Sequence, residues 1–228
     1  MAGHRSVPRA ALGFRVKTGR AIAVALAGPA ASPRLLFRRE VLLCDPKVPE
    51  SRQPYHGAIM PFVPATPEAA ERGRKTAERV ALAALRALVN ELRAAGVRPE
   101  AVALVVASNP DVSKIGSAHV RAHALEGILF REVLEAGARA SRLPARTLLE
   151  RDSVARASAG LRRSPAQLRR ALEEFGKQAG RPWRAEEKSA ALGAWLALAT
   201  KRLSRQVRSS HQSRVTSHQP VVSPRDLG

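Results

Sequence analysis

The sequence predicts an α/β fold in which a three-stranded antiparallel meander is continued by parallel strands, with helices on both faces of the mixed sheet. Three apolar runs separated by turn residues fill residues 10–43. Two more apolar runs follow, at 101–107 and 146–150, each preceded by a segment of helical spacing. The resulting order is three strands, helix, strand, helix, strand and then helices.

The meander is predicted from turn chemistry. Its strands are expected over 10–17, 20–27 and 34–43. Thr18-Gly19 marks the first turn, and Pro29 and Pro33 interrupt the chain before the third strand. Residues 44–65 contain five prolines and are expected to form a loop.

The helices are predicted from capping residues and periodicity. Thr66-Pro67-Glu68 combines a capping threonine, a proline in the first turn and an early acid, so a long helix should begin there and end at Gly96. The continuous apolar run at 101–107 is typical of a central buried strand. Further helices are expected at 116–138, 165–178 and 184–203, and a short helix or turn at 151–160.

Composition sets the domain organisation. The 228 residues predict a flexible N-terminus over 1–9, one domain over 10–203, and a basic, disordered tail over 204–228. The single cysteine, Cys44, rules out an internal disulfide and fits the reducing cytoplasm. The apolar runs are too short to span a bilayer, so no membrane contact is expected.

The charge is strongly positive. There are 39 Lys+Arg against 19 Asp+Glu, a net charge of +20. Residues 136–228 alone hold 19 basic against 7 acidic residues. A protein of this charge attracts polyanions, so DNA or structured RNA is the expected partner. Because only seven of the basic residues are lysine, a high-GC composition that favours arginine and alanine is the competing explanation.

The element order is that of the ribonuclease H-like fold, and the later segments resemble RuvC-type Holliday junction resolvases over roughly residues 11–200. GSAHVRAHALEGILFREVLEAG (116–137) is similar to the family's helix after its central strand. LPARTLLERDSVARASAG (143–160) resembles the next strand and the short basic element that follows it. RRSPAQLRRALEEFG (162–176) and AEEKSAALGAWLALA (185–199) resemble its last two helices.

The resemblance implies a nuclease that holds Mg²⁺ or Mn²⁺ between clustered acids. Most of these acids are absent here. Arg15 occupies the first expected position, in Gly13-Phe14-Arg15, and the central strand ends without an acid before Asp111. In the last helix Glu187 fits one position, Ala190 stands at the other, and Glu186 is an additional acid. First-turn acids also favour a helix by interacting with its dipole.

The sequence therefore favours a non-catalytic, RuvC-like pseudo-nuclease that contacts the phosphate backbone of duplex or structured nucleic acid and needs no cofactor. The basic residues expected to make these contacts are Arg15, Lys17, Arg20, Arg162, Arg163, Arg169 and Arg170. The first alternative is an active Mg²⁺- or Mn²⁺-dependent nuclease with Glu187, Glu186 and Asp111 as catalytic metal ligands. The second is a protein–protein scaffold, and Gly193-Ala194 would allow close helix packing in a homodimer.

Two further patterns concern metal and phosphate binding. His119 and His123 lie four residues apart on an expected helix, a spacing compatible with a metal, but no HExxH motif is present. They are predicted to be ordinary surface or interface histidines, with no metal site. Val16-Lys17-Thr18-Gly19-Arg20 resembles the phosphate hairpin of sugar kinases and actin-like proteins but lacks its acid and extra glycines.

Overall fold

A computed structural model describes residues 7–56 and 66–200, and it confirms the mixed sheet and the ribonuclease H-like order of elements. The strands are β1 (Arg9–Lys17), β2 (Arg20–Ala27), β3 (Arg34–Leu42), β4 (Arg98–Val106) and β5 (Ala145–Leu149). Their order across the sheet is β3-β2-β1-β4-β5. The first three strands pair antiparallel, whereas β4 is parallel to β1 and β5 is parallel to β4.

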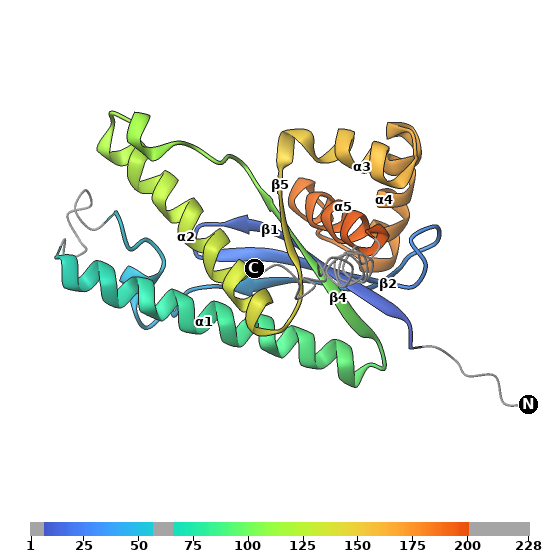
Figure 1. Ribbon diagram of the computed structural model, residues 1–228, viewed down its shortest axis with the longest axis horizontal. Coiled ribbons are helices and arrows are strands. Elements are labelled where there is room, and N and C mark those ends of the chain that lie inside the picture. Colours follow the sequence, from blue (N-terminus) through green and yellow to red (C-terminus); the bar gives the residue numbers. More distant parts are fainter. Residues whose placement is uncertain (1–6, 57–65, 201–228) are drawn as a thin grey trace, which may run out of the picture.

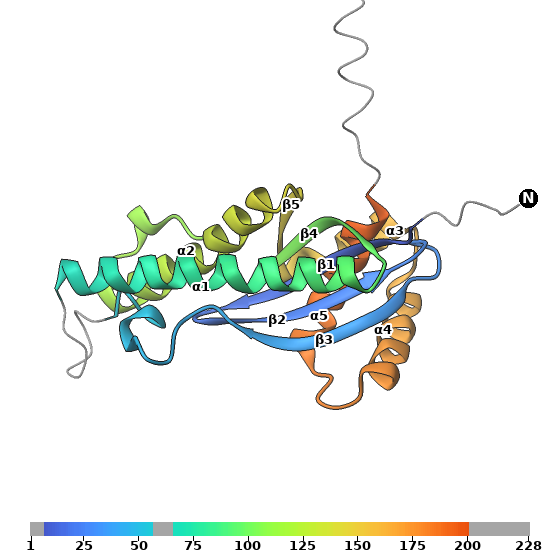
Figure 2. The same ribbon diagram turned by 90° about the horizontal axis from the view of Figure 1, so that it is seen from below.

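Helices cover both faces of this sheet (Figures 1 and 2). One face carries α1 (Pro67–Ala94) and α2 (Ala118–Ala140). The other carries α3 (Ser153–Leu161), α4 (Pro165–Ala179) and α5 (Ala185–Ala199). Short 3₁₀ turns occupy the connections: η1 (Pro49–Ser51), η2 (Val112–Lys114) and η3 (Glu150–Asp152).

The helix ends follow the capping chemistry of the sequence. The Thr66 hydroxyl accepts a hydrogen bond from the backbone N–H of Ala69 at 3.1 Å and starts α1. Ser164 and Gln167 form a reciprocal capping box at the start of α4. Along α1 the buried residues recur every three or four positions, from Ala69 to Leu92, so one stripe of the helix packs on the sheet.

Strand β1 divides its side chains between two cores. Leu12, Phe14 and Val16 belong to the core under α1 and α2. On the opposite face Gly13 lies directly under α5, where a Cβ would collide with the carbonyl oxygen of Ala190. The missing side chain of Gly13 thus lets the backbone of α5 approach the sheet closely.

The predicted boundaries agree with the structure to within a few residues. Strand β4 begins at Arg98, three residues before the expected start, and β1 begins at Arg9. Residues 1–6, the whole of the expected tail (204–228) and the end of the predicted last helix (201–203) lie outside the described residues. Among the helices that the structure describes, none combines the length and the apolar character needed to cross a membrane.

The small residues of the last helix do not form an outward surface. Ala194 is fully buried, and a Cβ at Gly193 would lie 3.0 Å from Val105 of β4. The expectation that these two residues could pack against a second subunit is therefore wrong, because α5 uses them to pack on its own sheet.

Candidate functional site at the carboxyl edge of the sheet

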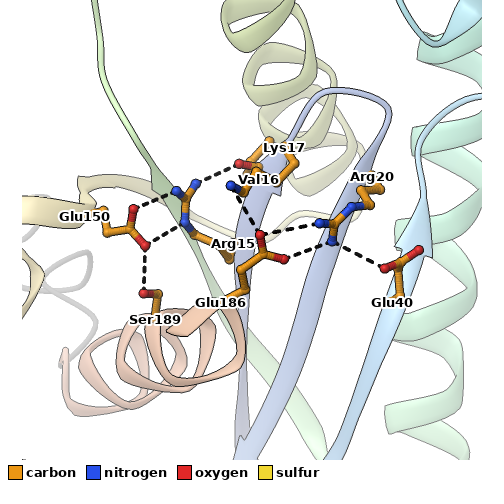
Figure 3. Close-up of polar contacts among 8 residues, drawn as sticks. All are labelled: Arg15, Val16, Lys17, Arg20, Glu40, Glu150, Glu186 and Ser189. Carbon is orange, nitrogen blue, oxygen red and sulfur yellow. Dashed lines mark hydrogen bonds and ion pairs between the residues drawn. The ribbon is translucent and has the colours of Figure 1, made fainter. Parts of the chain in front are cut away.

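The expected basic residues of the first hairpin meet two acids at the edge where the parallel strands end (Figure 3). Because β1, β4 and β5 run in the same direction, their carboxyl ends share this edge. Arg15 and Lys17 lie at the end of β1, and Glu150 directly follows β5. The first turns of α5 bring Glu186 and Ser189 to the same place.

Arg15 is buried, and each of its three guanidinium nitrogens donates a hydrogen bond. Its Nε donates to Glu150 Oε1 at 2.8 Å and its Nη2 donates to Glu150 Oε2 at 2.6 Å. The remaining Nη1 donates to the carbonyl oxygen of Val16 at 2.9 Å. Only 3% of Arg15 is exposed, whereas the Glu150 side chain keeps 36% of its surface in solvent. The pair is therefore a bidentate ion pair with one buried and one rim-exposed partner.

The ion pair changes the acidity of Glu150. Burial on its own would raise the pKa of the Glu150 carboxyl, but the hydrogen bonds and positive charge of Arg15 outweigh it and lower the pKa below its ordinary value. Ser189 adds a hydrogen bond from its hydroxyl to Glu150 Oε1 at 3.0 Å. Glu150 consequently stays ionised at neutral pH.

Glu186 is held by two cations from the hairpin. Arg20 Nη1 donates to Glu186 Oε2 at 2.9 Å, and Lys17 Nζ lies 3.2 Å from Glu186 Oε1. Arg20 also reaches Glu40 of β3 at 3.3 Å. Burial on its own would raise the pKa of Glu186. The hydrogen bonds and positive charges of Arg20 and Lys17 outweigh this effect, so the pKa lies below its ordinary value.

The three hairpin cations thus face three glutamates, and this edge is close to electrically neutral. We call the group of Arg15, Lys17, Arg20, Glu40, Glu150, Glu186 and Ser189 the carboxyl-edge cluster. Mg²⁺ requires several hard oxygen ligands that are free to bind it. In the cluster Glu150 and Glu186 are already occupied by cations, and a buried guanidinium lies beside them. These residues do not fit a magnesium ion.

The other two acids considered as metal ligands have local roles. Glu187 is 4% exposed, and its Oε2 accepts the backbone N–H of Arg184 at 2.8 Å, which caps α5. Asp111 Oδ1 accepts from the backbone N–H of Ser113 at 3.1 Å and starts the turn η2. Within residues 7–56 and 66–200, Glu186, Glu187 and Asp111 do not form a group of close ligands.

The remaining expected basic residues lie around α4. Arg162, Arg169 and Arg170 are exposed, and none has an ion-pair partner among the described residues. Arg163 differs, because it is half-buried: its Nη2 donates to the carbonyl oxygen of Ala31 at 2.6 Å, and its guanidinium lies 5.3 Å from the ring centroid of Trp195. Arg163 is therefore engaged in packing the β2–β3 turn.

Two more exposed arginines were not anticipated. Arg146 of β5 and Arg156 of α3 line one hollow of about 550 Å³ at the end of α5. Arg146 lies on the edge strand of the sheet, so its side chain projects at the border of the molecule. Their joint position depends on the packing of α3 beside β5, and the spacing along the chain gives no sign of it.

Comparisons with known proteins concern the fold. No protein-family model matches the chain, and no curated protein matches its sequence. Among solved structures, the chain is similar to Thermus thermophilus RuvC in complex with a Holliday junction substrate, at 13% identity and a TM-score of 0.49, over 82% of this chain and 91% of that chain.

Two further solved structures are also similar to the chain. A second Thermus thermophilus RuvC structure matches at 16% identity and a TM-score of 0.48, over 82% of this chain and 92% of that one. The yeast mitochondrial Holliday junction resolvase Ydc2 matches at 10% identity and a TM-score of 0.42, over 83% and 77%. The structures similar to this chain therefore include the resolvases that its sequence resembles.

Proposed function

We propose that the chain binds nucleic acid through the phosphate backbone and does not cut it. The observation that carries the second half of this proposal is the ion pair between Arg15 and Glu150. Two-metal cleavage needs carboxylates that bind metal ions. Here the carboxylates at the carboxyl ends of the parallel strands are neutralised by arginine and lysine.

We assign phosphate binding mainly to the exposed arginines that have no ion-pair partner among the described residues. Arg15, Lys17 and Arg20 are paired with acids, so they add little net attraction for phosphate. Arg162, Arg169 and Arg170, together with Arg146 and Arg156, are exposed and form no ion pair with a described residue. Each contact of this kind releases counterions from the nucleic acid, which makes binding dependent on salt and nearly independent of sequence.

The test is a gel-shift series with the full chain at two salt concentrations, with and without Mn²⁺. The probes are duplex DNA, single-stranded DNA, a structured RNA and a four-way junction, the last because Thermus thermophilus RuvC was solved with a Holliday junction substrate. The expected result is a shift that weakens steeply with salt, with every probe intact after incubation with Mn²⁺. The duplex and RNA probes also decide between DNA and RNA.

Two outcomes would replace the proposal. Mn²⁺-dependent cleavage that disappears in Glu187→Ala would establish the alternative nuclease, with Glu186, Glu187 and Asp111 as candidate ligands. No shift at low salt would remove nucleic acid as the partner and leave the protein–protein scaffold. Arg39→Ala is the control for loss of one positive charge. Arg39 is already paired with Glu91, so its removal should leave the gel shift of each probe unchanged.

A further inference from the structure

Three histidines from two distant segments meet on the face of the sheet that carries α2. His56 comes from the loop after η1, and His119 and His123 lie in the first two turns of α2. One ring nitrogen from each histidine lies within 4.8 Å of the other two. The ring centroids are 4.1 Å apart for His56 and His123, 4.6 Å for His119 and His123, and 5.1 Å for His56 and His119.

His56 is prepared as a ligand by Glu126. His56 is 2% exposed, and its Nδ1 lies 2.7 Å from Oε1 of the fully buried Glu126. An ionised carboxylate only accepts hydrogen bonds, so with Glu126 ionised the proton of His56 lies on Nδ1 and the lone pair lies on Nε2. Metal-binding histidines are commonly held in this way by a carboxylate on the other ring nitrogen.

The lone pair of His56 has no partner in the part of the chain that the structure describes. Its Nε2 is buried and has no hydrogen-bond partner among the described residues. A buried polar atom without a partner costs free energy, on the order of 1–3 kcal/mol. A group that binds this nitrogen would remove the cost, and the two other imidazoles lie beside it.

His119 and His123 have the spacing of two ligands on one ion. They are four residues apart on α2, so their side chains share one face of the helix. Their Nε2 atoms are 3.2 Å apart. In a tetrahedral zinc site with Zn–N distances of about 2.05 Å, two ligand nitrogens lie roughly 3.3 Å apart. Both side chains reach solvent, which leaves a fourth position open.

We propose that His56, His119 and His123 bind one zinc ion, with Glu126 as a positioning residue for His56 and with the fourth position open to water or an anionic oxygen. Imidazole ligands select zinc and its neighbours in the periodic table over Mg²⁺ and Mn²⁺. The ion would tie the loop after β3 to the start of α2. The site is separate from the carboxyl-edge cluster and does not depend on nucleic-acid binding.

The test is metal binding by the full chain, prepared without a histidine tag and stripped with a chelator. Titration with Zn²⁺ followed by elemental analysis should give one equivalent of tightly held zinc per chain. Replacement by Co²⁺ should give the visible absorption of a four-coordinate ion. Mg²⁺ at the same concentration should not compete.

Variants separate this site from incidental binding by histidine. His119→Ala and His123→Ala are exposed changes that should keep the fold and weaken zinc binding at least about 100-fold, whereas Glu126→Gln should weaken it about 10- to 100-fold. The control replaces the three other histidines, His4, His211 and His218, by alanine and should retain one equivalent. Less than one equivalent in the wild type, or zinc lost in the control but kept in His123→Ala, would overturn the proposal.

Discussion

The carboxyl-edge cluster and the histidine cluster share no residue, and they differ in whether their polar groups are satisfied. In the carboxyl-edge cluster, all three guanidinium nitrogens of Arg15 donate hydrogen bonds. Glu150 and Glu186 each accept from at least two donors. In the histidine cluster, one buried nitrogen of His56 has no partner within residues 7–56 and 66–200. The first arrangement is complete without a ligand, and the second is one ligand short.

The difference shows which of the two clusters has room for a ligand. The carboxyl-edge cluster leaves no vacant site, because the buried cation Arg15 is paired with the carboxylate of Glu150. An unsatisfied lone pair is the better indicator of a binding site, because folding leaves very few such groups buried.

The largest effect is expected for Gly13→Ala. The new Cβ would meet backbone atoms of α5 at Ala190 and Ala194, which cannot move independently. We expect the free energy of unfolding to fall by about 3 kcal/mol, because overpacking of a tight core costs that order of energy. Urea unfolding measures it, and cobalt absorption checks that the histidine cluster survives.

Gly127→Ala is the matched control for this substitution. Gly127 is an exposed residue of α2 with no atom within 4 Å of a new Cβ. Alanine there should raise the free energy of unfolding by up to about 1 kcal/mol through helix propensity. A loss below about 1 kcal/mol for Gly13→Ala would mean that α5 is not held as tightly as its contact with β1 indicates.

Zinc should stabilise the protein through the histidine cluster alone. At free zinc about 100-fold above its dissociation constant, the free energy of unfolding should rise by about 2.7 kcal/mol, since the ion binds the folded chain. Thermal unfolding with zinc and with chelator measures the shift. Arg15→Ala should keep it, and His123→Ala should lose most of it; a shift retained in His123→Ala contradicts a three-histidine site.

The sequence allowed good prediction of the fold because the signals that define it are local. Thr66 and Ser164 cap helices through residues three positions away, and Gly19 makes the first turn through its own positive φ of 72°. The position of Arg15 near the end of β1 could also be predicted, because strand alternation fixes the face on which each side chain lies.

The candidate sites could be predicted only in part, because each depends on partners that are distant in the chain. Glu150 is 135 positions from Arg15, and no local pattern links the two. The pair His119 and His123 was visible from its helical spacing, but the third histidine comes from a proline-rich loop without periodicity. The decisive contacts are made by tertiary packing, which single-sequence patterns do not contain.

Removing Arg15 should cost about 2 kcal/mol of unfolding free energy. Breaking a buried ion pair by deleting one partner typically costs about 3–5 kcal/mol, and the partial exposure of Glu150 reduces this penalty. Urea unfolding of Arg15→Ala gives the value. Arg39→Ala removes an arginine from an exposed bidentate pair with Glu91 and should cost about 0.5 kcal/mol. Equal losses in the two variants would contradict the burial of the Arg15 pair.

The penalty for Arg15→Ala should depend on pH in the acid range. The pKa of Glu150 is lower in the folded protein than in the unfolded chain, so its ion pair contributes stability above the unfolded pKa and loses it as pH falls through the folded pKa. The difference in unfolding free energy between wild type and Arg15→Ala should therefore shrink below about pH 4.5. Arg169→Ala, which removes no carboxylate partner in the described chain, should show a difference that does not change with pH.

The smallest effect on stability and the clearest effect on binding are expected for Arg169→Ala combined with Arg170→Ala. Both side chains are exposed, so the free energy of unfolding should change by less than about 0.5 kcal/mol. If both contact phosphates of duplex DNA, the slope of log affinity against log salt should become shallower by about 1.8, or about 0.9 for each arginine.

Arg163→Ala should show the opposite result, with a larger effect on stability and a smaller effect on binding. Arg163 contacts other residues, whereas Arg169 and Arg170 have no ion-pair partner among the described residues. It removes the bond to Ala31 and the contact with Trp195, so it should destabilise the fold by about 1 kcal/mol. It should change the salt slope less than the Arg169 and Arg170 pair does. The salt slope could instead stay unchanged in the double variant and become shallower in Arg163→Ala. That result would mean that the nucleic acid contacts the β2–β3 turn and not the outer face of α4.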